Sequence, residues 1–483
     1  MAALIRRATA WRHWHRWLGI IACTGLLLWS FSGLGHPIMV RLQPQAANFM
    51  PPTLTLGEQA AKLAAPADVL QQRNINAVKH LRLLNWDGDA VYQAIATDSD
   101  QVIYIDAFDG TRHSGNDADY AVWLARYYAG EHNAAVTSIS PVTRFAGEYG
   151  PVNRLLPAYR VTFDRSDDLR VYVSTRTSRP GTLVDNNKAA FDWLFRHLHK
   201  WDWLKPVEPV RIAIALLFVT AAFVTAASGL YVYLLGWRSR SHSEKSLPVW
   251  HRRLSLVVAL AILSFSFSGG YHLLKMWQRD FFAIPAQTTF QFAAATLTAT
   301  PAEIASTGTW QDFTLVAVAD KPYYRATASQ RGGNSHGMQH DHSGQHGGSL
   351  IPASYHAADT GDVIAGIDEL HAIELATKFS GLPAQQVSSV TAITRFGGEY
   401  GFVNKFLPVI RVEFDTPGQK RFYVEPASGK LAAEINDSDQ LEGWAFAYLH
   451  KWNFLNGLGN DIRDGVMGLF ALGHMIVAGL GIM

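Results

Sequence analysis

The sequence contains a single cysteine, Cys23, among 483 residues. One cysteine cannot form an intrachain disulfide, and it excludes zinc and iron–sulfur sites built from several thiolates. Charged residues are also scarce, because Asp, Glu, Lys and Arg together make up 17% of the chain and the net charge is only +2. No long basic run is present, so the sequence lacks the clustered positive charge that binds nucleic acid. Any metal chemistry must therefore use histidine or carboxylate side chains.

What the chain does contain is apolar sequence, at 48% of all residues. Four stretches have the length needed to cross a bilayer. They are Trp17–Leu34, Val210–Leu235, Leu254–Leu274 and Ile462–Met483. We interpret the first as an anchor and not as a signal peptide, because its apolar run is long and no small-residue cleavage site follows it.

Basic residues mark one side of these spans. Four arginines precede the first span, and five basic residues fill the short link between the second and third. These residues are Arg6, Arg7, Arg12, Arg16, Arg238, Arg240, Lys245, Arg252 and Arg253. The positive-inside rule places both segments in the cytoplasm. The sequence thus predicts a multi-pass protein of the bacterial inner membrane, with a cytoplasmic N-terminus and large periplasmic domains.

The chain repeats itself. Trp14–Arg16 matches Trp250–Arg252 at an offset of 236 residues, and Phe31–His36 matches Phe267–His272 at the same offset. Farther along, the offset is 251: Thr143–Gly150 matches Thr394–Gly401, and His199–Trp201 matches His450–Trp452. The chain is therefore two copies of a unit made of a span, an external domain and a second span, and the second copy carries an insertion of about fifteen residues.

This duplication predicts a membrane protein with four transmembrane helices and two α+β external domains. Helical periodicity is present at residues 57–65 and 368–379, and strand-like alternation at residues 90–96, 102–106, 159–163 and 411–414. The predicted parts are a cytoplasmic N-terminus with the first helix (1–36), an external domain (37–209), a helix (210–236), a cytoplasmic loop (237–250), a helix (251–275), a second external domain (276–461) and a last helix (462–483).

Two histidines recur at the ends of the first and third spans. His15 and His36 are 21 residues apart, as are His251 and His272. On a helix this spacing is about 31 Å, close to the bilayer core thickness, and it leaves the two side chains about 60° apart around the axis. A twofold relation between the copies brings His15 to His251 and His36 to His272. Paired imidazoles are the axial ligands of b-type haem, so we predict two haem sites; the alternative is that these histidines only hydrogen-bond between helices or reach the interface.

Three further histidines lie near the spans. His199 and His450 lie in aromatic segments before the second and fourth spans, and they are alternative outer ligands or part of an interfacial aromatic belt. His474 lies inside the fourth span and has no counterpart in the second, so it is a lone ligand or a packing residue.

Two other features of the sequence are candidate binding sites. The glycine-rich insertion at 332–348 is either a capture loop for a transition metal or a passive linker, and its candidate ligands are His336, Met338, His340, His342 and His346. The duplicated turns have a packing role or line a surface for an anionic chelate, through Arg144, Tyr149, Arg395 and Tyr400.

These motifs give the chain a resemblance to PepSY-associated transmembrane proteins over nearly its whole length. The similarity rests on His15–Gly19, His251–Arg252, the two His-Lys-Trp segments and the repeated Tyr-x-Asp/Glu-x-x-x-Gly turns. Within that family the chain resembles haem-containing inner-membrane ferric-siderophore reductases. The resemblance implies electron transfer to iron chelates in the periplasm, whereas PepSY domains elsewhere regulate peptidases.

Two functions follow as hypotheses. The first is an oxidoreductase in which two b haems carry electrons outward to a ferric siderophore or another metal chelate. The sequence has no Gly-x-Gly-x-x-Gly unit after a strand, so the electron donor is expected to be a separate molecule. The second is a scaffold without enzymatic activity, which binds a periplasmic protein, peptidase or metal.

Overall fold

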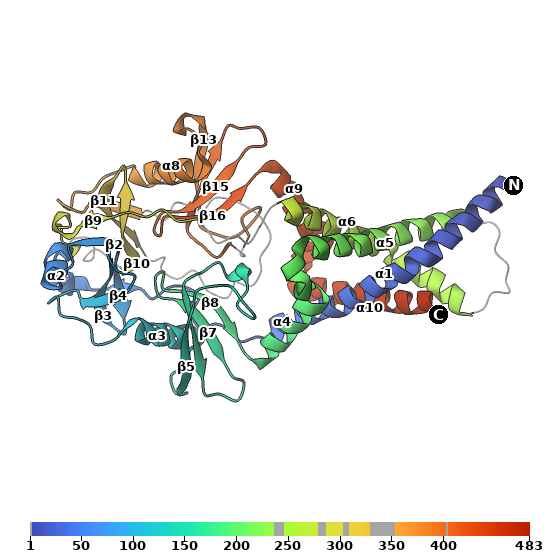
Figure 1. Ribbon diagram of the computed structural model, residues 1–483, viewed down its shortest axis with the longest axis horizontal. Helices are drawn as coiled ribbons and strands as arrows, with labels where there is room; N and C mark the ends of the chain where they lie inside the picture. Colours follow the sequence, from blue (N-terminus) through green and yellow to red (C-terminus); the bar gives the residue numbers. More distant parts are fainter. Residues whose placement is uncertain (1, 236–245, 279–285, 303–308, 329–352, 402–403) are drawn as a thin grey trace.

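The computed structural model describes residues 2–235, 246–278, 286–302, 309–328, 353–401 and 404–483. The predicted metal-capture loop, with His336, Met338, His340, His342 and His346, lies outside these residues. The described chain forms a helical bundle at one end and a β-rich region at the other (Figure 1). Both chain termini lie at the end of the bundle that points away from the sheets.

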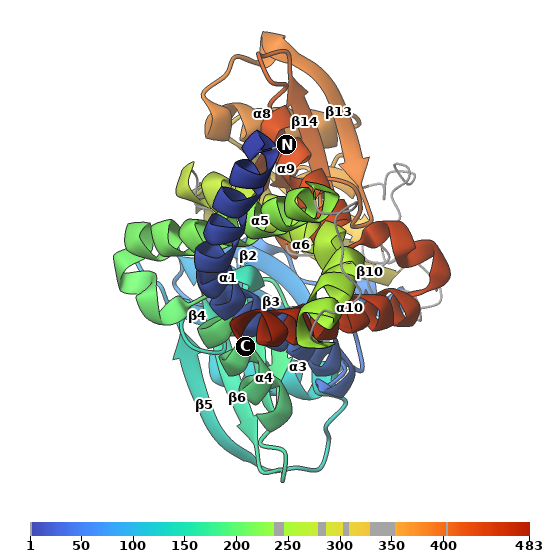
Figure 2. The ribbon, with the colours of Figure 1, turned by 90° about the vertical axis from the view of Figure 1, so that its right-hand side faces the viewer.

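The bundle consists of four long helices: α1 (Ala2–Leu42), α5 (Glu208–Leu235), α6 (Ser246–Gln278) and α10 (Asn460–Ile482). Each is long and apolar enough to cross a membrane, and each contains one of the four predicted spans apart from the terminal Met483. Helix α1 contacts both α5 and α10, and α6 contacts the same two helices (Figure 2). The bundle core contains Ala22, Ala221 and Ala222 beside Val258, Ile262 and Val477. Small side chains at these positions let the helix backbones approach closely, as is usual within a bilayer.

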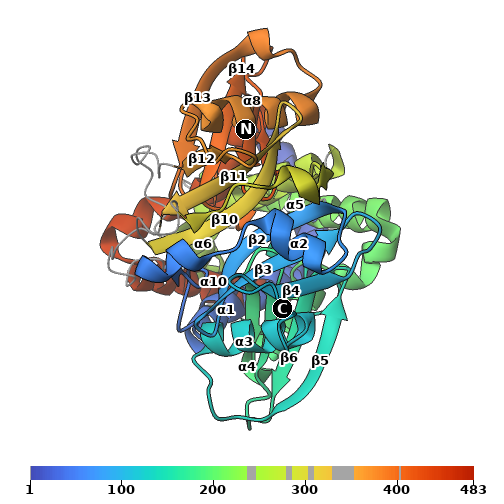
Figure 3. The same cartoon turned by 90° about the vertical axis from the view of Figure 1, so that its left-hand side faces the viewer.

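The external region contains three antiparallel sheets. The central sheet has the strand order β12-β11-β10-β2-β3-β4, with β1 added beside β10 and β9 beside β2 (Figure 3). Its strands are β1 (Leu54–Thr55), β2 (Ala77–Trp86), β3 (Asp89–Ala96), β4 (Val102–Asp106), β9 (Phe292–Ala293), β10 (Thr309–Val318), β11 (Lys321–Ala328) and β12 (Ala353–Ala357).

The central sheet joins the two copies. Strand β2 of the first copy pairs with β10 of the second, and β1 and β9 each pair with a strand of the opposite copy. The hairpins on either side turn at equivalent positions: Asp87 and Gly88 in the first copy, Ala319 and Asp320 in the second, all with positive φ. Two-residue turns of this kind match the natural twist of paired strands. The external domains predicted at 37–209 and 276–461 therefore share one sheet.

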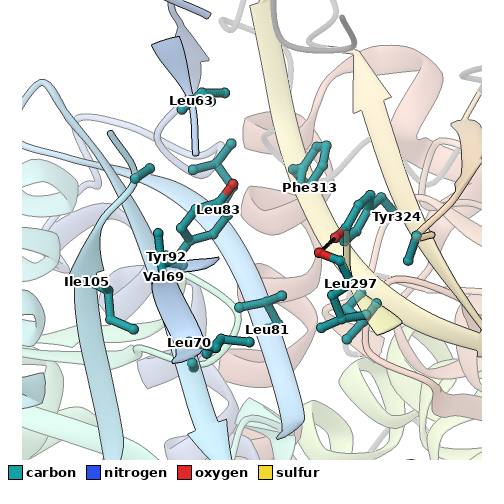
Figure 4. Packing of buried hydrophobic residues seen from close by; sticks show 14 of the residues in the cluster. Leu63, Val69, Leu70, Leu81, Leu83, Tyr92, Ile105, Leu297, Phe313 and Tyr324 are labelled. Carbon is teal, nitrogen blue, oxygen red and sulfur yellow. Dashed lines mark hydrogen bonds between the residues drawn. The ribbon is translucent and has the colours of Figure 1, made fainter. Parts of the chain in front are cut away.

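The core beneath this sheet is also shared. Leu81 and Tyr92 come from the first copy, and Leu297, Phe313 and Tyr324 from the second, in one buried cluster (Figure 4). The Tyr324 hydroxyl donates a hydrogen bond of 3.4 Å to the Leu297 carbonyl. Apolar side chains from both copies are thus removed from water together, which couples the stability of the two halves.

Each copy also has a sheet of its own, covered by a helix. In the first copy α3 (Asp117–Ala129) packs on β5 (Val136–Val142), β6 (Ala158–Phe163), β7 (Arg170–Ser174) and β8 (Arg179–Val184). In the second, α8 (Ile367–Ser380) packs on β13 (Val387–Ile393), β14 (Val409–Phe414), β15 (Arg421–Glu425) and β16 (Lys430–Ile435).

The predicted strands all lie within observed strands, and the predicted helix at 368–379 lies within α8. The predicted helix at 57–65 is instead a short 3-10 helix (Gly57–Lys62) followed by α2 (Pro66–Gln72). Pro66 explains the break, because proline disfavours helical geometry in the residue before it and is well suited to the first helical turn.

Short helices link the sheets to the bundle. In the first copy these are α4 (Asn186–Leu198) and a 3-10 helix (Asp202–Val207); in the second they are α9 (Asp437–Ala445), a π-helical turn (Phe446–His450) and a 3-10 helix (Asn453–Leu458). Helix α4 packs against α1, and α9 with the π-helical turn packs against α6. The His-Lys-Trp segments are thereby held at the end of the bundle nearest the sheets, its outer end; the opposite end is its inner end. Further 3-10 turns are Pro151–Asn153, Ala294–Thr296 and Ala384–Gln386.

Candidate functional site: two histidine pairs in the bundle

The first pair lies near the end of the bundle that carries the chain termini. His15 on α1 faces His251 on α6, with ring centroids 6.5 Å apart and ring planes at 65°. The His15 Nδ1 lies 3.0 Å from the Thr225 carbonyl oxygen, which can only accept a hydrogen bond. The proton of His15 is therefore on Nδ1, and its Nε2 retains a free lone pair.

The surroundings of this inner pair repeat in the two copies. The ring of His251 lies beside the backbone of Val477 as His15 lies beside Thr225, but within the described residues the Nδ1 of His251 has no hydrogen-bond partner. A Cβ atom built on Gly229 would lie 2.9 Å from His15 Cε1, and one built on Gly481 would lie 3.3 Å from His251 Cε1. Glycine at these positions leaves space for each imidazole ring against the neighbouring helix.

The second pair lies at the outer end. His199 follows α4 and His450 ends the π-helical turn, and their ring centroids are 6.5 Å apart with the planes at 89°. The rings stack on the phenylalanine four residues earlier, His199 on Phe195 at 4.5 Å and His450 on Phe446 at 4.7 Å. This stacking holds both imidazoles in a defined orientation.

The tautomer of the outer histidines follows from two serines. The Ser32 hydroxyl donates to the Leu28 carbonyl at 2.7 Å, so it accepts from His199 Nδ1 at 3.1 Å. In the second copy Ser268 donates to the Ser264 carbonyl at 2.9 Å and lies 3.2 Å from the Nδ1 of His450. Because a serine has a single proton to donate, both histidines carry hydrogen on Nδ1 and leave Nε2 free.

The predicted outer ligands, His36 and His272, flank this pair. His36 packs against Phe195 at 5.6 Å, on the helix that ends at His199. His272 packs against Phe446 at 4.7 Å, and its Nδ1 lies 2.6 Å from Glu442 Oε1. At this end of the bundle, His199 of the first copy and His450 of the second make the ring contact between the copies. They meet because the segments after α4 and α9 fold back over the end of the bundle.

His474 lies between the two levels. It is buried on α10 with 3% of its surface exposed, and its ring meets Phe265 edge-on at 5.8 Å. Within the described part of the chain its Nε2 has no hydrogen-bond partner. The second span carries Phe223 at the equivalent position, so this histidine belongs to one copy alone.

Of the two roles considered for the duplicated turns, the burial of their tyrosines favours packing over a ligand surface. Tyr149 and Tyr400 are each only 1% exposed, so neither can contact a docked molecule. Their hydroxyl groups donate to the carbonyls of Leu155 and Phe406, at 2.7 and 2.9 Å. The glycine two residues before each tyrosine has positive φ, which turns the chain back so that the ring enters the core.

Arg144 and Arg395, in the same turns, are exposed to solvent. They remain available to an anionic partner, but without the tyrosines beside them.

The sequence did not identify the groups that support the histidines. Phe195, Phe446, Gly229 and Gly481 all occupy equivalent positions in the two copies, at offsets of 251 or 252 residues. Comparing the second and fourth spans position by position would have found the two glycines.

The arrangement provides two imidazole pairs with Nε2 free on at least three of the four rings, each able to hold a metal-centred group between the copies. Within the described residues no group of three or more His, Cys, Asp or Glu side chains could hold a metal ion. The candidate site is therefore two pairs of ligands and not a cluster.

Among known protein families, the chain matches the one described as PepSY-associated TM region, over residues 12–393. The match runs from α1 to the end of β13 and covers most of the chain, so the protein belongs to this family. No characterised protein of similar sequence matched. With its four apolar helices, the chain is a multi-pass membrane protein with α+β domains.

Proposed function

We propose that this PepSY-associated membrane protein transfers electrons across its membrane through two b-type haems, and that it reduces ferric iron held in a siderophore or another metal chelate. The single observation that carries the proposal is the repeated 6.5 Å separation of paired imidazole rings, His15 with His251 and His199 with His450.

The separation suits a shared metal ion. Two imidazoles bound to opposite sides of one ion, each at a metal–nitrogen distance of about 2 Å, place their ring centroids roughly 6 Å apart. A haem needs only these two protein ligands, because the porphyrin supplies the other four. Isolated pairs of histidines therefore favour haem over a metal ion held by protein side chains alone, because such an ion takes three or four protein ligands.

The hydrogen bonds around the pairs also suit this role. Histidine ligands usually donate their second ring N–H to a carbonyl or other acceptor, which fixes the tautomer and ring orientation. Thr225 accepts this bond from His15, Ser32 accepts it from His199, and Ser268 is placed to accept it from His450. When bound, haem supplies the one-electron redox couple, and the protein tunes its potential through such contacts.

The two levels are separated along the membrane normal. From His15 to Ser32, which contacts the outer pair, α1 rises by about 25 Å, close to the thickness of the bilayer core. One pair thus lies near each face of the membrane. Two sites in series would let an electron cross in two shorter steps.

The direction of transfer follows from the charges at the two ends. Arg12, Arg16 and Arg252 lie beside the inner pair, and the positive-inside rule assigns that end to the cytoplasm. A separate donor would then supply electrons at the end that holds His15 and His251, and the chelate would accept them at the periplasmic end. Each electron converts one Fe³⁺ of the chelate to Fe²⁺, which a chelator built for the ferric ion holds less tightly.

The decisive test is an absorption spectrum of detergent-purified protein, oxidised and then reduced with dithionite, with haem quantified as the pyridine haemochromogen. We expect two b haems per chain. His251→Ala should remove the inner haem, and His199→Ala or His450→Ala the outer one.

The variants His36→Ala and His272→Ala are the matched comparison. Retention of both haems in these variants assigns the outer site to His199 and His450, whereas loss of one assigns it to His36 and His272. Protein that binds no haem, when expressed with ample haem supply, would exclude the electron-transfer mechanism and favour a scaffold that binds a periplasmic protein, peptidase or metal.

A further inference from the structure

A second site lies in the external region, away from the histidine pairs. A cavity of about 430 Å³ opens where the edge strand β4, the start of α3 and the start of β6 meet. These three elements lie together in the first copy (Figure 3). The cavity is within the size range of pockets that hold small organic molecules, and it is far larger than a single inorganic ion requires.

The cavity wall mixes apolar and charged side chains. Ile103, Pro141 and Pro157 contribute apolar surface, and the rings of Tyr104 and Tyr159 also line it. A ligand with an apolar or aromatic body would therefore bury part of its surface here.

Within the described part of the chain, the carboxylates of the cavity wall have close partners, whereas the guanidinium groups of the wall do not. Asp117 accepts a hydrogen bond of 2.7 Å from the Tyr104 hydroxyl, and Asp100 forms an ion pair of 2.8 Å with Lys79. Arg112 and Arg176 form no ion pair within 4.0 Å of a carboxylate among the described residues. Arg176 is nevertheless near enough to Asp100 to help Lys79 lower the pKa of that carboxyl. Both carboxylates thus have partners inside the protein, and the two guanidinium groups are available to a ligand.

The second copy shows that the fold does not require these cations. At an offset of 251 residues, Arg112 corresponds to Val363 and Arg176 to Ala427. The equivalence is structural as well, because Arg112 bridges to Ile105 as Val363 bridges to His356. The same backbone therefore forms with apolar residues at both positions, so the arginines are not needed for folding.

We propose that this cavity binds a small organic anion that carries carboxylate groups on an apolar or aromatic body, with Arg112 and Arg176 as its charged anchors. The planar guanidinium group can donate two parallel hydrogen bonds to one carboxylate. The tyrosine and proline side chains cover the body of the ligand. This site does not depend on haem binding, and it stands or falls separately from the proposed electron transfer.

The test is isothermal titration calorimetry on the full-length protein in detergent. The probes are phthalate and isophthalate, with dimethyl phthalate as the uncharged analogue and inorganic phosphate as the anion without an organic body. We expect saturable binding of at least one carboxylate and none of dimethyl phthalate or inorganic phosphate.

The variants use residues that the second copy already carries. Arg112→Val and Arg176→Ala should each weaken carboxylate binding at least tenfold, whereas Lys321→Ala, at an exposed cation of the second copy, should leave it unchanged. Arg112 is itself exposed, so Arg112→Val keeps the test valid if Arg176→Ala impairs folding. The proposal is overturned if neither carboxylate binds, if both arginine variants bind the carboxylate as tightly as the wild type does, or if inorganic phosphate binds as well as the carboxylates.

Discussion

Arg82 and Thr314 lie directly opposite each other in the central sheet, as paired residues of β2 and β10. They are also equivalent residues of the two copies, 232 positions apart, as the turns at Asp87 and Ala319 are. The axis that relates the copies therefore passes between them. The paired histidines of the bundle face each other for the same reason.

Because the copies share a core, damage to one should destabilise both. Phe313→Ala removes a buried ring that packs in the cluster containing Leu81 and Tyr92. We expect the free energy of unfolding to fall by about 3–5 kcal/mol, as for other buried phenylalanines, in one transition for the whole external region. Scanning calorimetry of the detergent-solubilised protein measures this. Val363→Ala, at a side chain that is 69% exposed, is the control and should change stability by less than about 0.5 kcal/mol. Two separate transitions would contradict a shared core.

The glycine against His15 should control the inner haem. In Gly229→Ala the new Cβ would lie 2.9 Å from His15 Cε1, too close for the ring to keep its position. We expect haem content to fall from two towards one per chain although all histidines remain. Gly481→Ala, with a clearance of 3.3 Å at His251, should have a smaller effect. Gly465→Ala, on the same helix in open space, serves as the control. Full haem content in Gly229→Ala would argue against the inner site.

The serines that bind the outer histidines should tune the outer haem. Ser32→Ala or Ser268→Ala leaves the Nδ1–H of one histidine without its acceptor, and loss of such a partner typically weakens metal binding by about 10–100-fold. We expect a shift in the midpoint potential of one haem, measured by spectroelectrochemical titration, and easier loss of that haem. Thr24→Ala, at an exposed position of α1, should leave both potentials as they are. Unchanged midpoint potentials in both serine variants would show that Ser32 and Ser268 do not influence the outer haem.

His371 should make the external region sensitive to acid. Burial, with smaller contributions from the positive charges of Arg325 and Lys378, lowers the pKa of His371 to about 3. The unfolded chain takes up a proton at this position below about pH 6.5, which the folded protein does not do until about pH 3. The free energy of unfolding should therefore decrease by about 1.4 kcal/mol per pH unit as the pH falls through this window.

This contribution can be measured from Tm values at pH 7 and pH 5. We expect the wild-type protein to lose more stability over this range than His371→Phe does. His132→Phe, at an exposed histidine, should behave as the wild type. An equal loss in wild type and His371→Phe would show that other groups cause the acid sensitivity.

The sequence alone determined the membrane topology class and the duplication. Apolar runs of 18 or more residues must be helical in a bilayer, because every backbone group there needs a partner within its own segment. The repeated His-Arg, Phe-Ser-Gly and His-Lys-Trp motifs identified the two copies and all the histidines that now form pairs. The pairing of His15 with His251 followed from the twofold relation between the copies.

The contacts that do not follow from the twofold relation between the copies were decided by the tertiary structure. It brought His199 to His450 because α4 and α9 fold back onto the bundle, a contact that no local pattern encodes. It buried Tyr149 and Tyr400, for which the sequence left packing and ligand contact both open, because a positive-φ glycine reverses each turn. It also joined the external domains in one sheet, since strand pairing between copies depends on backbone groups that every sequence has. Local periodicity specifies the elements, but long-range packing specifies their partners.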